Sequence, residues 1–292
     1  MALLNTPFAL PQLIVDDAVR AALLEDLGRA GDITTVSTVP DHAAAKGELV
    51  SREAGIVCGV HAARTAFRLM EPALDFQISI QDGTEVAKGD VIATIQGSAR
   101  AVLSAERVAL NYMMHLSGIA THTAAFVSEV RHTRARISCT RKTIPGDRVF
   151  AKYAVRCGGG TNHRFGLDDA VLIKDNHIAV SGSVAGAVKA ARAYVGPLVK
   201  VEIEVDTLEQ LEEALASGPD AVLLDNMGAE ILAEAVAINK RNNDGRVKLE
   251  ASGGVDLSTV RSIAETGVDF ISTSKITMGA PSFDIGLDMG IS

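Results

Sequence analysis

The second half of the chain alternates short apolar segments with amphipathic ones, and this rhythm restricts the fold more than any other feature. The strand-like segments are 200–205, 221–225, 247–251 and 268–272, and the helical patterns between them are 208–216, 230–240 and 257–265. A strand followed by a helix, repeated at intervals of roughly 21 to 26 residues, is typical of a parallel sheet or barrel. We therefore predict an α/β fold with a parallel α/β barrel in this part of the chain.

The first part of the chain has a different pattern. Its expected elements are a helix over 16–26, a loop over 27–35, short strands within 45–60 and 75–96, and a helix over 104–115. Residues 82–90 resemble the hairpin of a hammerhead or barrel-sandwich carrier domain, in which a lysine at the tip is modified. Lys88 lacks the flanking residues of such a lysine, so we interpret the hairpin as structural. A non-catalytic hammerhead-type binding module remains an alternative reading of this region.

Composition and charge exclude several classes of function. The chain has 292 residues, a formal net charge of −8 and no tryptophan, which argues against binding nucleic acid. Its three cysteines are widely spaced and form neither a disulfide framework nor a zinc motif, so a cytoplasmic setting is expected. The start of the chain contains Pro7 and Pro11 and lacks a basic segment, so we expect no signal peptide and no membrane span.

Residues 131–174 concentrate positive charge within this acidic chain. The segment contains ten lysines and arginines and three aspartates, a net charge of +7. It also contains Cys157-Gly158-Gly159-Gly160, followed by Asn162-His163-Arg164. Glycines allow backbone N–H groups to approach an anion, and guanidinium groups bind carboxylates or phosphates with two hydrogen bonds. This combination predicts an anion-binding site, and a solvated basic face is the alternative.

Polar residues stand where the predicted strands end, at Glu204, at Asp225, at 252–254 and at 272–274. In parallel α/β folds the active site lies at the carboxyl ends of the strands. Glu204 ends an alternation of charged and apolar residues that is unusual in a parallel strand, so we expect its side chain in the site. The same is expected of Asp225, although an acid at this position could instead cap the helix that follows.

The residue types at these strand ends predict what the site binds. Ser252-Gly253-Gly254 and Ser272-Thr273-Ser274 suit a phosphate, and the helix expected from Leu257 would direct its positive end there. Carboxylates at neighbouring strand ends suit Mg²⁺ or ribose hydroxyls, and the basic cluster suits a dicarboxylate. Together these features fit a transferase that acts on a phosphorylated sugar.

Several long motifs resemble those of the quinolinate phosphoribosyltransferase family. These motifs are 25–27, 31–35, 106–107, 140–146, 152–160, 162–164, 172–177 and 249–254. The resemblance implies a type II phosphoribosyltransferase fold, in which an N-terminal α/β sandwich domain is followed by an incomplete parallel α/β barrel. The implied boundaries are 1–116 for the sandwich and 117–276 for the barrel, and a tail over about 277–292 packs back on the first domain.

The resemblance also implies a reaction. Members of the family transfer the phosphoribosyl group of phosphoribosyl pyrophosphate to quinolinate, with Mg²⁺ as cofactor. The products are nicotinate mononucleotide, pyrophosphate and CO₂, in de novo NAD biosynthesis. A phosphoribosyltransferase of the same fold that acts on another pyridine or on a molybdenum-associated substrate is the alternative.

Individual residues receive roles from the same resemblance. The implied substrate-binding residues are Arg107, Thr140, Arg141, Lys142, His163, Arg164, Lys174, Glu204, Asp225, Ser252, Gly253, Gly254, Ser272, Thr273 and Ser274. Lys142, Glu204 and Asp225 are the implied catalytic residues. Glu204 and Asp225 are also the implied ligands of Mg²⁺. Ser274 departs from the family pattern, which usually has glycine there, and its Cβ would restrict a positive φ.

The basic residues have two implied roles. Arg141, Arg164 and Lys174 match the pocket that binds the carboxylates of quinolinate. Arg107 matches an arginine that reaches the pocket of the neighbouring subunit. This match implies a homodimer, or a hexamer built as a trimer of dimers, with shared active sites.

Overall fold

The structure is a computed structural model that describes residues 9–291, and the chain divides into two compact units. The first unit runs to His122 and also contains Val149–Gly159 and Ala280–Ser292, whereas the second contains Thr123–Arg148 and Gly160–Gly279. This division differs from the implied domain boundaries, because residues 149–159 group with the first unit. Residues 1–8, where we expected no signal peptide, lie outside the described residues.

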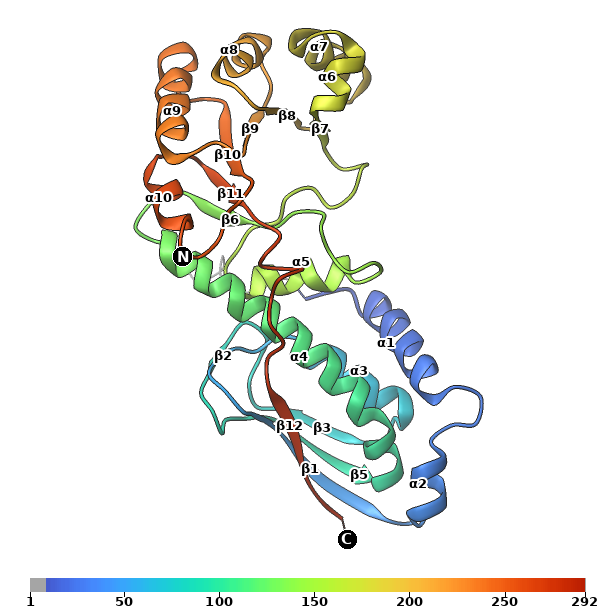
Figure 1. Ribbon diagram of the computed structural model, residues 1–292. Coiled ribbons are helices and arrows are strands. Elements are labelled where there is room, and N and C mark those ends of the chain that lie inside the picture. The colour runs from blue at the N-terminus through green and yellow to red at the C-terminus, as the bar shows by residue number, and fades with distance from the viewer. Residues whose placement is uncertain (1–8, 292) are drawn as a thin grey trace. The chain divides into compact units, whose positions relative to one another are not determined.

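An antiparallel sheet forms the centre of the first unit (Figure 1). Its strand order is β12 (Ile285–Ile291), β1 (Ala44–Ser51), β5 (Val91–Ser98) and β3 (Asp75–Ile78). β12 pairs with β1 along its whole length, from Ser51 opposite Ile285 to Ala45 opposite Ile291. The C-terminal segment is therefore an edge strand of this sheet.

Helices of the first part of the chain extend further than the sequence indicated. They are α1 (Gln12–Leu27), α2 (Ile33–Thr38), α3 (Val60–Met70), α4 (Ala99–Val130) and α5 (Arg148–Cys157). The predicted helix 104–115 is the middle of α4. α3 buries Phe67, whose ring lies 5.6 Å from that of Phe76 in β3. Among the helices within residues 9–291, none combines the length and the apolar composition needed to cross a lipid bilayer.

The carrier-like hairpin at 82–90 is a structural turn. Lys88 is exposed between β4 (Glu85–Val86), which pairs with β2 (Gly55–Ile56), and β5. Gly89 has a φ of +95°, which only glycine adopts readily, and a carboxylate oxygen of Asp90 accepts the Ala87 N–H at 2.8 Å. The turn residues are thus explained by backbone geometry alone.

A parallel sheet forms the centre of the second unit. Its strand order is β6 (Arg136–Ser138), β11 (Phe270–Ser272), β10 (Lys248–Ser252), β9 (Ala221–Asp225), β8 (Val201–Val205) and β7 (Val171–Ile173). Every neighbouring pair is parallel. Within the described residues the sheet is open at β6 and β7, and this confirms the predicted incomplete barrel.

Helices connect these strands (Figure 1). They are α6 (Asp175–Ser181), α7 (Val184–Tyr194), α8 (Leu208–Ser217), α9 (Ala229–Asn243) and α10 (Val260–Glu265). In β8 the side chains of Val201, Ile203 and Val205 are buried. Glu202 and Glu204 alternate with them and are only half-buried, so they lie on the opposite face.

Candidate active site

The carboxyl ends of the parallel strands surround one cavity of about 510 Å³. Because the strands run in the same direction, residues that follow each of them reach the same edge of the sheet. The register places Ser252 beside Asp225 and Ser272 beside Ser138 at this edge. The cavity lies entirely within the second unit.

Nearly all the residues expected in the site line this cavity. The lining residues that the sequence indicated are Thr140, Arg141, Lys142, His163, Arg164, Lys174, Glu204, Asp225, Ser252, Gly253, Gly254, Ser272, Thr273 and Ser274. Arg107 is the exception, because it is an exposed residue of α4 in the first unit. Segments that are more than 100 residues apart in the sequence are thus brought together by the parallel sheet.

Three cationic residues form a set among the residues that line the cavity, and we refer to this set as its cationic wall. The three are Arg141, Arg164 and Lys174. The Nε atoms of Arg141 and Arg164 are buried and have no hydrogen-bond partner among the described residues. Burial, and secondarily the positive charge of Arg141, lowers the pKa of Arg164. Unsatisfied guanidinium donors held close together are suited to a bound anion.

Acidic side chains face the same cavity. Lys174 forms an ion pair with Glu204, whose side chain is 12% exposed. Asp225, at the end of β9, accepts a hydrogen bond from the Asn226 amide at 2.6 Å. The two carboxylates are therefore held at neighbouring strand ends, where they can meet hydroxyl groups or a cation.

The turn after β10 is built so that only glycine fits. Gly253 has a φ of +92°, and a Cβ at this position would lie 2.1 Å from Oδ1 of Asn226. Asn226 itself has a φ of +54°, and its N–H donates to the Ser252 carbonyl at 2.8 Å. The backbone of this turn consequently borders the cavity without a side chain in between.

The helix expected to point at this turn is not placed as predicted. α10 begins only at Val260, and a turn precedes it. The Asp256 carboxylate accepts the N–H groups of Ser258 at 2.9 Å and of Thr259 at 3.1 Å. Hydrogen bonds from Ser258 lower the pKa of Asp256 to about 2. The helix thus begins later than predicted, and its contribution to phosphate binding stays a prediction.

Serine at position 274, where the family pattern usually has glycine, causes no backbone strain. Among the described residues other than glycine, only Asn226 and Asp244 have a positive φ. The Ser274 carbonyl accepts the N–H groups of Thr277 at 3.1 Å and of Met278 at 2.9 Å, so the residue opens an ordinary turn. Lys275 follows it in the cavity wall, 3.4 Å from the Asp256 carboxylate.

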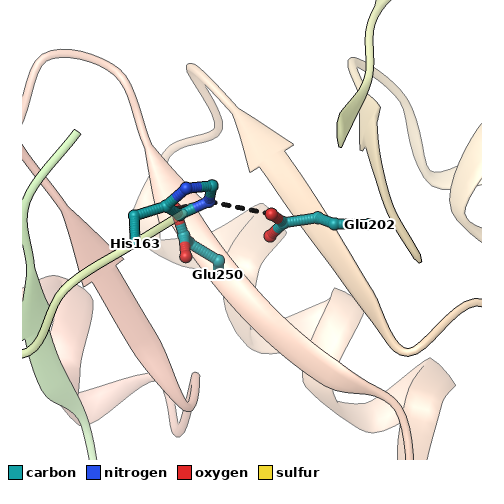
Figure 2. Close-up of side chains that lie close together, drawn as sticks. All are labelled: His163, Glu202 and Glu250. Carbon is teal, nitrogen blue, oxygen red and sulfur yellow. Dashed lines mark hydrogen bonds and ion pairs between the residues drawn. The ribbon is translucent and has the colours of Figure 1, made fainter. Parts of the chain in front are cut away.

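A cluster of His163, Glu202 and Glu250 was not predicted as a unit (Figure 2). His163 Nε2 lies 2.8 Å from a Glu202 oxygen and 3.6 Å from a Glu250 oxygen. Glu250 is only 4% exposed. Burial, and then the nearby charge of Glu202, raises the pKa of Glu250 to about 7. The sequence held a signal, since Glu250 interrupts an apolar strand and a buried acid requires a partner.

The chain matches one protein family over nearly its whole length. Residues 32–117 match the family described as "Quinolinate phosphoribosyl transferase, N-terminal domain". Residues 119–288 match "Quinolinate phosphoribosyl transferase, C-terminal domain". The two matches include the cavity and the strands that form it.

Relatives with assigned names cover the chain almost completely. The nicotinate-nucleotide pyrophosphorylase [carboxylating] of Mycobacterium leprae is 44% identical, over 94% of this chain and 96% of that protein. The quinolinate phosphoribosyltransferase [decarboxylating] 1 of Nicotiana glauca is 37% identical, over 98% of this chain and 85% of that protein. The solved structure of NadC from Streptococcus pyogenes is 40% identical, with a TM-score of 0.92 over 98% of this chain and 99% of that one.

Proposed function

The chain belongs to the quinolinate phosphoribosyltransferase family, and from this premise we propose its reaction. It transfers the phosphoribosyl group of phosphoribosyl pyrophosphate to quinolinate and releases pyrophosphate and CO₂. The product is nicotinate mononucleotide, a precursor in NAD biosynthesis. The observation that carries the proposal is one cavity whose lining combines the cationic wall with two strand-end carboxylates and a glycine turn.

Quinolinate is a planar dianion, and the cationic wall matches it. Arg141 and Arg164 present half-buried guanidinium groups whose Nε atoms are unpaired among the described residues, and Lys174 adds a third positive charge at the cavity. Two adjacent carboxylates use such a cluster more fully than the single carboxylate of nicotinate. Thr140 and His163 supply further hydrogen-bonding groups in the same wall.

The sugar donor fits the other residues that line the cavity. The turns at 252–254 and 272–274 offer backbone N–H and hydroxyl groups to the 5′-phosphate. Glu204 and Asp225 accept hydrogen bonds from the ribose hydroxyls. Their spacing at neighbouring strand ends also suits Mg²⁺, which in proteins takes one or two carboxylates together with substrate phosphates. Bound Mg²⁺ would neutralise charge on the pyrophosphate as it departs.

The proposed reaction depends mainly on the stabilisation of charges that develop as it proceeds. As the bond from C1′ to pyrophosphate breaks, positive charge develops on the ribose, and Glu204 and Asp225 stabilise it. Lys142 offers a cation to the leaving pyrophosphate. The quinolinate nitrogen attacks C1′ and becomes positively charged, which stabilises the carbanion left when the adjacent carboxylate departs as CO₂. A proton from solvent then replaces the carboxylate at that carbon. No step removes a proton from a substrate, so no dedicated general base is required.

The assembly and the compartment are parts of the same proposal. Exposed Arg107 suits the role of completing the cavity of a neighbouring subunit in a homodimer, or in a hexamer that contains such dimers. The cytoplasm suits a chain whose cysteines, Cys58, Cys139 and Cys157, are buried and form no disulfide within the described residues.

A direct assay tests the reaction. Purified protein is incubated with quinolinate, phosphoribosyl pyrophosphate and Mg²⁺, and nicotinate mononucleotide and CO₂ are measured. Nicotinate in place of quinolinate separates this function from that of a transferase for another pyridine. Turnover of nicotinate in preference to quinolinate would contradict the proposal, as would binding of either pyridine without turnover.

A further inference from the structure

We propose that Glu202 and Glu250 are positioning residues, which hold the imidazole of His163 in the cavity wall as a hydrogen-bond donor to the pyridine substrate. This inference rests on the proposed function, because it assigns His163 to the quinolinate side of the cavity. Neither acid contacts the substrate in this assignment. Both act through the histidine ring.

The geometry of the cluster supports this role. The Nε2 atom of His163 lies 2.8 Å from Glu202 Oε2, which is a hydrogen-bond distance, and 3.6 Å from Glu250 Oε1. Figure 2 shows the ring with one nitrogen directed at Glu202 and with Glu250 beside it. An Nε2–H that faces two acids fixes the ring orientation, and the protonated ring then uses its Nδ1–H as the donor to the substrate.

The acids stand on a more rigid scaffold than the histidine. His163 lies between α5 and β7, in a segment without helix or strand. Glu202 and Glu250 belong to β8 and β10, the strands that flank β9 in the centre of the sheet. Side chains on regular strands hold their positions better than side chains on loops. The two strands thus fix the position of the His163 side chain, although His163 itself belongs to a loop.

Burying Glu202 and Glu250 next to each other costs free energy, so we expect the pair to have a role in the site. The Glu250 oxygen nearest to His163 is buried and has no hydrogen-bond partner among the described residues. A second acid, Glu202, lies beside it and also faces the charge of Arg164. Paired buried acids persist where their charge is used. Here Glu202 accepts the His163 N–H and also lies near the positive charge of Arg164.

A metal ion explains the cluster less well. In a tetrahedral zinc site with bonds of about 2.0–2.1 Å, ligand atoms lie roughly 3.3 Å apart. The 2.8 Å between His163 Nε2 and Glu202 Oε2 is shorter than that and matches a shared proton. A further cation would also have to approach the positive wall that contains Arg141 and Arg164.

The test combines conservative substitutions with a double-mutant cycle. Glu202→Gln keeps an oxygen that accepts the His163 N–H, whereas Glu202→Met does not. We expect the KM for quinolinate to rise by about threefold for Glu202→Gln and by at least about tenfold for Glu202→Met and Glu250→Met, with the KM for phosphoribosyl pyrophosphate within about twofold of wild type. In a His163→Ala background, Glu202→Met should change the KM for quinolinate by less than about twofold. Glu234→Gln, an exposed acid on α9, is the control.

Each outcome decides one question. A wild-type protein that does not use quinolinate overturns the proposed function itself. An active wild type in which Glu202→Met has its full effect without His163 overturns the positioning role, as does a Glu202→Gln variant as impaired as Glu202→Met. Zn²⁺ that binds the wild type in calorimetry, and binds none of the variants, would make the cluster a metal site instead. A large change in the chemical shifts of the His163 imidazole in NMR spectra of Glu202→Met, with a smaller change in Glu202→Gln, supports the proposal without relying on activity.

Discussion

Lys174, which follows β7, forms an ion pair with Glu204 on the neighbouring strand β8, inside the cavity. The proposed function gives these residues different substrates, since Lys174 binds quinolinate and Glu204 binds the sugar donor. Each side chain therefore neutralises the other before the substrates bind. When both substrates are bound, Lys174 interacts with quinolinate and Glu204 with the sugar donor. Removal of one partner leaves the other uncompensated.

This pairing predicts the effect of Lys174→Ala. The variant loses a cation for the quinolinate carboxylates and exposes them to the unpaired charge of Glu204. We expect quinolinate to bind more than about tenfold more weakly, or about 1.4 kcal/mol, in calorimetry. Lys200→Ala is the matched control, because Lys200 forms an ion pair with Asp220 at 2.8 Å and does not line the cavity. Equal affinities for the two variants would remove Lys174 from the pocket.

The turn at Gly253 predicts a steric effect. In Gly253→Ala the new Cβ would lie 2.1 Å from Asn226 Oδ1, and the residue would keep a φ of +92°. We expect a loss of roughly 2–4 kcal/mol in the free energy of unfolding and a higher KM for phosphoribosyl pyrophosphate. Gly245→Ala also has a positive φ but open space around it, so it should cost only about 1 kcal/mol and leave the KM unchanged. Urea unfolding and steady-state kinetics measure the difference.

The raised pKa of Glu250 predicts how stability depends on pH. The folded protein holds this proton up to about pH 7, whereas the unfolded chain releases it near the ordinary value of 4.5. Folding therefore takes up a proton between these values, and the stabilisation is lost as the pH rises through that window. Glu250→Gln removes the dependence, so its stability relative to wild type should increase by roughly 1–3 kcal/mol between pH 5 and pH 8. Unfolding curves that stay parallel over this range would contradict the assignment.

Asp225→Asn addresses the proposed Mg²⁺ site. Asparagine keeps the size of the side chain and one oxygen but removes the charge that attracts Mg²⁺ and stabilises the ribose cation. We expect kcat to fall by at least about a hundredfold and the Mg²⁺ concentration at half-maximal rate to rise by about tenfold. Titration of MgCl₂ in the assay measures both. Asp220→Asn, an acid of the same unit outside the cavity lining, should leave the Mg²⁺ dependence unchanged.

The strand rhythm of the second unit was readable from the sequence because buried parallel strands leave runs of apolar residues. The segments predicted at 200–205 and 221–225 match β8 and β9. The acids at their ends could be assigned to the site because such ends share one edge of the sheet. β6 and β7 have only three residues each, which is too short for a periodic signal.

The cluster around His163 could not be read from the sequence in the same way. Its members are separated by 39 residues between His163 and Glu202, and Glu250 comes later still. Local periodicity predicts which face a residue occupies, but it does not predict which residue of a distant loop will reach that face. The same limit explains α10, where hydrogen bonds to Asp256 replace the first turn of the expected helix.

Arg107 and Glu204 together test whether sites are shared between subunits. Arg107 is an exposed residue of the first unit, whereas Glu204 lines the cavity of the second. If Arg107 completes the cavity of a neighbouring subunit, Arg107→Ala and Glu204→Ala should each be inactive alone. A mixed dimer would contain one site with both defects and one site with neither. Mixing equal amounts should therefore restore about a quarter of wild-type activity when subunits exchange at random.

The measurement needs independent proof that subunits exchange. Differently tagged variants are mixed, the doubly tagged species is isolated, and its rate of nicotinate mononucleotide formation is compared with that of each parent. A pair made of Glu204→Ala and Asp225→Ala is the control, because both residues line the same cavity and no mixed dimer has an intact site. Recovery in the Arg107 pair alone is the expected result. Isolated mixed dimers without activity would mean that Arg107 does not act across a subunit interface.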